Sequence, residues 1–201
     1  MDTEFALTAR ADFLLSGNWS QFKDHTSMRG SENGALLGIA LNYERGEYGT
    51  AGPVGGEIES VGVTADLSLE GDGWNAMFAL IWYSYDSDVT GGIDEDVYGL
   101  VAQGGVFFTD DTEGFARLEW GDVDSLTTGF GTMMEMDELL VLTVGVNKYY
   151  YGHDVKWTTD IGYAFDAVDG ANWGSTTAGW RGDGYDDDSQ IVIRTQLQLL
   201  F

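Results

Sequence analysis

Eight charged side chains lie in stretches where polar and apolar residues alternate along the chain. Each of the eight occupies a polar position of its stretch. Because successive side chains of an extended strand point to opposite faces, each charge belongs to a polar face backed by an apolar one. Such charges can act on ions in a water-filled interior, or they can pair across neighbouring strands. Pairing is the simpler interpretation of any single residue, whereas the whole set predicts a wet interior. The eight residues are Arg10, Asp12, Asp66, Arg117, Glu119, Lys156, Asp160 and Arg194.

Acidic residues gather in four further places, between the alternating stretches. Oxygen-rich clusters can hold Ca²⁺ or Mg²⁺, but none of these has the DxDxDG spacing of a dedicated calcium loop. We therefore expect solvated acidic loops that divalent cations bridge weakly to anionic lipid headgroups, without a specific metal site or cofactor. The clusters are Asp86 and Asp88; Asp94, Glu95 and Asp96; Glu135, Asp137 and Glu138; and Asp186, Asp187 and Asp188.

The residue types that usually carry catalysis are scarce. The chain has no cysteine, which excludes thiol chemistry, disulfides and cysteine metal sites. Its two histidines, His25 and His153, lie in connectors, where a surface role is expected for both. No Walker loop, dinucleotide fingerprint, HExxH or nucleophile elbow occurs. The sequence does not predict an enzyme, and a net charge of −25 argues against nucleic acid as a partner.

The elements that position these residues are strands. The longest apolar run, residues 76–83, is far shorter than the roughly 18 residues of a membrane-spanning helix. Alternation of apolar and polar residues instead predicts strands bounded by turn-rich sequence. In residues 59–70, for example, valine, alanine and leucine alternate with serine, glycine, threonine and aspartate. The nine predicted strands span residues 4–15, 34–44, 59–70, 74–85, 96–108, 114–121, 138–150, 155–165 and 189–201.

The last strand, SQIVIRTQLQLLF, is the most informative. Isoleucine, threonine and leucine alternate with polar residues, and the chain stops on Phe201, which belongs to the apolar face. Outer-membrane β-barrels close with such a strand, apolar towards lipid and polar towards the lumen. We therefore predict an all-β fold, an antiparallel transmembrane β-barrel of porin type, in which residues 1–201 are a single barrel segment.

Aromatic residues come at both ends of the predicted apolar faces. Amphipathic rings favour the two interfaces of a bilayer, so we expect two aromatic girdles. The alternative is a soluble β-sandwich in which the aromatic residues simply cap the core. The outer girdle would hold Tyr43, Trp82, Tyr98, Trp120 and Tyr163, and the inner girdle Phe13, Trp74, Phe108, Tyr150 and Phe201.

Connector lengths provide an independent test. Counted back from the last strand, long and short connectors alternate seven times, as extracellular loops and periplasmic turns do in bacterial barrels. Residues 17–33 are the exception, a long connector on the periplasmic side. Nine strands cannot close with antiparallel pairing, and an open edge is not tolerated in lipid. We expect the C-terminal part of a larger barrel; residues 1–5 do not resemble a signal peptide.

Several segments resemble the C-terminal portion of the phosphate-selective porin O and P family. They are FLLSGNW (residues 13–19), GALLGIALNYERGEY (34–48), LTVGVNKYYYGHDVKWTTDIGY (142–163) and the closing RTQLQLLF (194–201). The resemblance implies a water-filled barrel of roughly sixteen or more strands, trimeric in its best-known members and selective for anions. Their cationic binding residues lie mostly in the other half of the barrel, so no binding residue is transferred. The balance of 9 Lys and Arg against 34 Asp and Glu departs from an anion channel.

The expected function is passive diffusion of small hydrophilic solutes or ions through a porin in the outer membrane. The expected partners are outer-membrane lipids, the barrel-assembly machinery through the C-terminal strand, and further copies in a homotrimer. A non-conducting barrel with a structural or adhesion role is the alternative. A soluble β-sandwich that binds a ligand or Ca²⁺ is a third interpretation.

Overall fold

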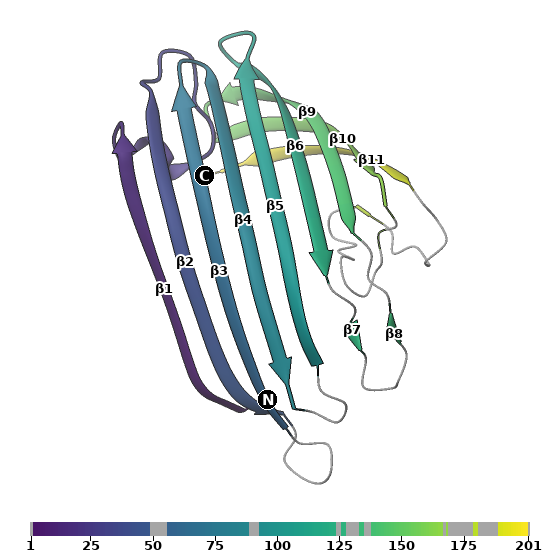
Figure 1. Cartoon of the computed structure of the whole chain (residues 1–201). Coiled ribbons are helices and arrows are strands. Elements are labelled where there is room, and N and C mark those ends of the chain that lie inside the picture. The colour runs from purple at the N-terminus through teal and green to yellow at the C-terminus, as the bar shows by residue number, and fades with distance from the viewer. Residues whose placement is uncertain are drawn as a thin grey trace.

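The computed structural model describes residues 2–48, 56–88, 93–123, 126–127, 133–134, 138–166, 168, 179–180 and 189–200. Nine strands form one sheet in which every neighbouring pair is antiparallel, in the order β1-β2-β3-β4-β5-β6-β9-β10-β11 (Figure 1). Their bounds are β1 Asp2–Ser16, β2 Gly34–Tyr48, β3 Gly56–Gly71, β4 Trp74–Ser87, β5 Ile93–Phe107, β6 Thr112–Val123, β9 Leu139–Tyr151, β10 Val155–Ala164 and β11 Gln190–Leu199.

All nine predicted strands are present, and the all-β antiparallel class is confirmed. The sequence did not predict a separate two-stranded hairpin, β7 Leu126–Thr127 with β8 Met133–Met134. The only helical element in the described residues is one 3₁₀ turn, η1 Gln21–Lys23. No helix in that part of the chain is long and apolar enough to span a membrane.

The two ends of the sheet differ in their connectors. At one end, here called the short-turn end, β3 is joined to β4 by Asp72 and Gly73, and β9 to β10 by three residues. Gly73 has φ +73°, a conformation that glycine adopts without a steric cost. The other end, the long-connector end, joins β2 to β3, β4 to β5, β6 to β9 and β10 to β11. The long connector of residues 17–33 lies at the short-turn end, so it is the exception to the alternation of connector lengths that the sequence predicted.

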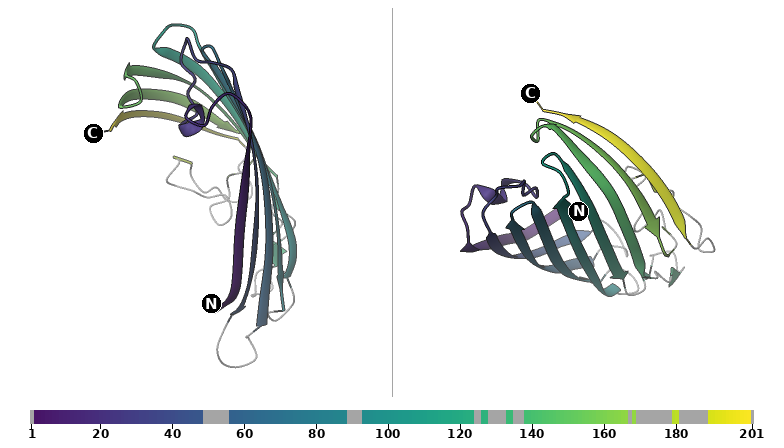
Figure 2. Two further views of the ribbon diagram at one scale, coloured as in Figure 1. Left: turned by 90° about the vertical axis from the view of Figure 1, so that its left-hand side faces the viewer. Right: turned by 90° about the horizontal axis from the view of Figure 1, so that it is seen from above.

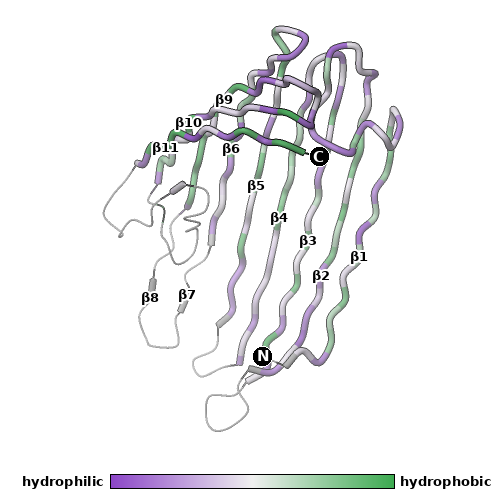
Figure 3. The backbone as a smooth tube through the Cα atoms, turned by 180° about the vertical axis from the view of Figure 1, so that it is seen from behind, coloured by the Kyte–Doolittle hydropathy of each residue, from purple (hydrophilic) through white to green (hydrophobic). Residues whose placement is uncertain are grey.

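The two faces of the sheet have opposite character. The outer face carries large apolar side chains that nothing covers in the described chain, such as Ile193 at 72% and Val106 at 61% exposure. Hydrophobic and hydrophilic residues alternate along the strands (Figure 3). Polar residues, in contrast, are buried on the inner face. They are Ser60, Glu70, Asn75, Ser87, Glu95, Glu113, Thr143 and Asp160.

The sheet is curved but not closed. Figure 2 shows it bending around one side, with the connector that holds η1 inside the curve. β1 pairs only with β2, and β11 only with β10, so both are edges within the described chain. Both edges run towards the short-turn end, where the Leu200 amide donates to the Asp154 carbonyl oxygen. The expected open sheet with these two edges is confirmed, whereas the nine strands by themselves form no barrel.

Candidate functional site

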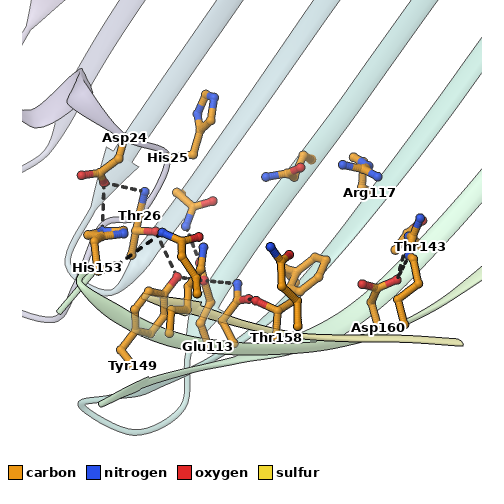
Figure 4. Close-up of a pocket in the computed structure, with 18 residues that line it drawn as sticks. Asp24, His25, Thr26, Glu113, Arg117, Thr143, Tyr149, His153, Thr158 and Asp160 are labelled. Carbon is orange, nitrogen blue, oxygen red and sulfur yellow. Dashed lines mark hydrogen bonds and ion pairs between the residues drawn. The ribbon is translucent and has the colours of Figure 1, made fainter. Parts of the chain in front are cut away.

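A polar hollow lies on the inner face, between β4 and β11, near the short-turn end. Its volume is about 620 Å³, and eighteen residues line it (Figure 4). They come from β4, β11 and the four strands between them, from the connector of residues 17–33, and from the turn between β9 and β10. The lining residues face inward because they occupy the positions that alternate with the apolar outer face. The hollow is therefore a direct product of strand periodicity and sheet curvature.

The connector of residues 17–33 folds across the inner face and closes one side of the hollow. The Ser27 hydroxyl, 1% exposed, donates to the Gly71 carbonyl oxygen at 2.6 Å, and Arg29 Nη2 donates to the Phe107 carbonyl oxygen at 2.7 Å. Further along the sheet, Thr26 Oγ1 lies 3.0 Å from the Tyr149 hydroxyl. One segment thus contacts the ends of β3, β5 and β9. Its length, unexpected for a periplasmic turn, is explained by this crossing.

Histidine and aspartate extend the same crossing. His153 Nε2, in the turn between β9 and β10, lies 3.2 Å from Asp24 Oδ1, and its ring packs edge-on against Tyr149 with centroids 5.5 Å apart. His153 precedes Asp154 in the chain but pairs with a residue of a distant connector. His25 also lines the hollow (Figure 4). His25 is exposed and His153 is half-buried, and both lie at the rim of the hollow.

Glu113 is the centre of a hydrogen-bond network in the hollow. It is 4% exposed and accepts hydrogen bonds from Asn75 Nδ2 at 2.6 Å, Asn147 Nδ2 at 2.9 Å and the Tyr149 hydroxyl at 2.7 Å. Gly105 leaves the space for it, since a Cβ there would lie 2.2 Å from Glu113 Oε1. Three donors compensate the loss of water around this buried carboxylate.

Removing this carboxylate is expected to destabilise the sheet. Glu113→Leu leaves three donors without an acceptor, which costs on the order of 3 kcal/mol or more of unfolding free energy. Glu113→Gln keeps one acceptor oxygen and should lose less. Urea unfolding of the protein in detergent micelles measures both values, with Thr64→Val on the inner face of β3 as control. Equal stability of the Leu and Gln variants would contradict the assigned network.

The eight charged candidates all lie on the inner face, but in two separate groups. On β6, Arg117 Nε lies 3.0 Å from Glu119 Oε2, and between β10 and β11, Arg194 Nη2 lies 2.7 Å from Asp160 Oδ1. Lys156 has no carboxylate partner in the described chain; its Nζ lies 5.8 Å from the centre of the Tyr149 ring. The remaining three, Arg10, Asp12 and Asp66, form the second group on β1 and β3.

This second group depends on a glycine. Arg10 donates to both Asp66 oxygens, at 2.8 and 3.0 Å, and lies 2.7 Å from Asp12 Oδ1. Arg10 reaches from β1 to β3 over the intervening strand at Gly38, which stands in register between Asp12 and Asp66. A Cβ on Gly38 would lie 2.1 Å from Arg10 Nη2. The ion pair therefore ties three strands together only because position 38 has no side chain.

A further ion pair joins β9 to the turn between β5 and β6. Lys148 Nζ lies 2.7 Å from Asp111 Oδ1 in the turn between β5 and β6. The ammonium group, with hydrogen bonds from Thr109 and Thr112, lowers the pKa of Asp111 to about 2. This carboxylate therefore stays charged over the whole physiological pH range.

The predicted girdle residues within the described chain all belong to the outer face. Trp82 and Tyr98 are direct cross-strand partners, and Tyr43 packs against Phe5 with ring centroids 6.0 Å apart. Trp74 and Trp82 are eight residues apart on β4, roughly 26 Å along a strand at about 3.3 Å per residue. Phe201 lies outside the described residues. Phe5, Trp157 and Phe165 are further exposed outer aromatics that the prediction missed.

The acidic clusters lie only partly within the described residues. Within the described chain, no group of three or more His, Cys, Asp or Glu side chains is arranged to hold a metal ion. Asp86, Asp88 and Asp94 are exposed, whereas Glu95 is buried. Glu135, Asp137 and Asp186 to Asp188 lie outside the described residues.

Sequence reasoning also missed the neutral part of the hollow. Its inward amides and hydroxyls include Asn75, Gln103, Thr143, Asn147, Gln196 and Gln198. The signal was present, because these residues occupy the same alternate positions as the charged candidates. Attention to charge alone left them out.

Comparison of the chain with protein-family models, with curated proteins and with solved structures found no match. The resemblance to the phosphate-selective porin O and P family therefore stays a hypothesis. The geometry of the two faces has to carry the functional argument.

Proposed function

We propose that this chain forms part of the wall of an outer-membrane porin that lets small hydrophilic solutes or ions diffuse passively. The distribution of side chains carries this proposal. Soluble proteins bury their large apolar residues and rarely expose an apolar patch of more than a few hundred Å². Here the outer face exposes them on strand after strand, while polar and charged residues are buried inside the curve. A sheet between lipid and water has this arrangement.

Strand length supports the same proposal. β1 to β5 contain 14 to 16 residues each, more than the 9 to 11 or so that a tilted strand needs to cross the hydrocarbon. β10 and β11 contain 10 residues each. With the short-turn end in the periplasm, the longer strands rise above the outer leaflet at the long-connector end.

Closure of the wall requires more strands. Both edges run in the same direction, so only an odd number of added strands gives an antiparallel seam. Open edges in lipid would leave about ten backbone polar groups unpaired, at several kcal/mol each. We therefore propose that further strands complete the barrel, and we expect residues 1–201 alone to form no discrete channel. Stable channels from these residues alone would contradict this.

The test is single-channel recording of the complete protein in a planar lipid bilayer. Discrete conductance steps are expected for an open pore. Their absence from correctly inserted protein would favour the second candidate, a non-conducting structural barrel. One observation favours that candidate: the connector of residues 17–33 covers part of the inner face, and Val168 and Trp180 pack over Val141 and Ala164.

Ion selectivity is a separate expected result. Acidic groups around an entrance raise the local cation concentration, and the chain carries 34 Asp and Glu against 9 Lys and Arg. We expect no strong anion preference in reversal-potential measurements. Any cation preference should fade in concentrated salt, because the screening length falls from about 10 Å at 0.1 M to about 3 Å at 1 M. Strong anion preference at low salt would refute this expectation.

A further inference from the structure

We propose that the polar hollow is a binding site for an uncharged, polyhydroxylated solute of the carbohydrate class. This inference rests on the proposed porin function and names the class of solute. Three features of the described residues carry it: balanced charges, amides that are free to bond, and an aromatic ring beside them.

The charges that line the hollow are balanced in number, and within the described chain all of them except Lys156 have a partner. Three cationic side chains, Arg117, Lys156 and Arg194, face three carboxylates, Asp24, Glu113 and Asp160. Arg194 is paired with Asp160, Arg117 with Glu119 on its own strand, and Glu113 has its three donors. A charged solute would have to give up its hydration at a place whose charged side chains balance, where only Lys156, beside the Tyr149 ring, lacks a carboxylate partner among the described residues. Electrostatics therefore favour an uncharged solute at this place.

Several neutral side chains of the hollow, in contrast, have hydrogen-bond donors and acceptors without a partner in the described chain. The side-chain amides of Gln103 and Gln196 make no hydrogen bond with other described residues, and each offers two N–H donors and one acceptor oxygen. The Thr143 hydroxyl is 1% exposed, and its oxygen has no hydrogen-bond partner in the described chain. Buried polar atoms are normally paired, so an unpaired hydroxyl at the wall of a hollow indicates a ligand or water.

Donors and acceptors side by side suit hydroxyl groups, because each hydroxyl both donates and accepts. Gln103 on β5 and Thr143 on β9 flank Arg117 on β6 in one cross-strand row, and Gln196 projects from β11 across the curve. The ring of Phe115 lies between these strands, over Gly145, where a Cβ would be 2.6 Å from its Cζ. A sugar ring presents an apolar C–H face to such an aromatic and hydroxyls to the amides around it.

The test uses the complete protein in a planar bilayer, with glucose and a glucose disaccharide as probes. A bound sugar blocks ion flow, so the ionic conductance should fall with sugar concentration and reach saturation. Inorganic phosphate at the same concentrations should produce no saturable fall. Gln103→Leu and Gln196→Leu should each raise the half-saturating sugar concentration about fivefold, the factor for one lost hydrogen bond. Thr64→Val, on the inner face of β3 outside the hollow, should leave it unchanged.

The outcomes separate the two levels of the proposal. Normal conductance steps in the Leu variants show that they are assembled. Conductance steps without a saturable sugar effect would overturn the binding site and leave the porin standing, whereas an absence of steps would overturn the porin itself. A saturable block by phosphate instead of sugar would show that the hollow is an anion site, against this inference.

Discussion

Leu197→Asp is expected to assemble poorly into a membrane, whereas Gln196→Asp, one residue earlier, should assemble almost normally. Leu197 is 59% exposed on the apolar outer face, and Gln196 projects into the hollow. A charge on the lipid face costs roughly 2 to 4 kcal/mol for Arg or Lys near the midplane, and somewhat less for Asp. Inward positions contact water and tolerate the charge. The fraction that folds into lipid vesicles, read from the heat-modifiable band on a gel, measures the difference.

A second matched pair lies on another strand. Val63→Asp should impair assembly and Thr64→Asp should not, because Val63 alternates onto the outer face of β3. The first pair lies on the edge strand β11 and the second on β3, with five strands between them, so a common result would not depend on one strand. Equal effects at the two members of either pair would show that the assignment of faces is wrong.

Replacing residues 19–31 with a short Gly-Ser turn is expected to raise the single-channel conductance severalfold. This connector lies inside the curve, and Ser27, Arg29 and Thr26 fasten it to β3, β5 and β9. In the proposed pore, removing it opens the cross-section that ions traverse, and it unpairs the strand-end groups that these three side chains contact. Planar-bilayer recording measures the change.

Single substitutions in the connector test its contacts to the strands one at a time. Thr26→Val removes one contact to Tyr149 and should change the conductance little, because the other anchors stay in place. Thr109→Ala, in the turn of the same end but outside the connector, serves as control. An unchanged conductance after replacement of the whole connector would mean that residues 19–31 do not narrow the pore.

Strand periodicity is a local property, and so the sequence alone determined it. Alternation of side chains follows from the geometry of an extended backbone, and the nine strands and the faces of Leu197 and Gln196 could be predicted without any tertiary contact. Composition likewise excluded thiol chemistry and argued against a nucleic-acid partner. The odd number of strands makes the first and the last run in the same direction, which predicted an open sheet.

Only the tertiary structure decided which inward groups meet. Arg10 and Asp66 are 56 positions apart, and their pairing required the register of three strands and the space at Gly38. Glu113 lies near the start of β6, and its hydrogen-bond donors come from β4 and β9. The space for its carboxylate comes from Gly105 on the neighbouring strand β5. No local pattern predicts the path of a connector that folds inward, because its contacts come from strands distant in sequence. The hollow that these contacts enclose became visible only in the folded chain.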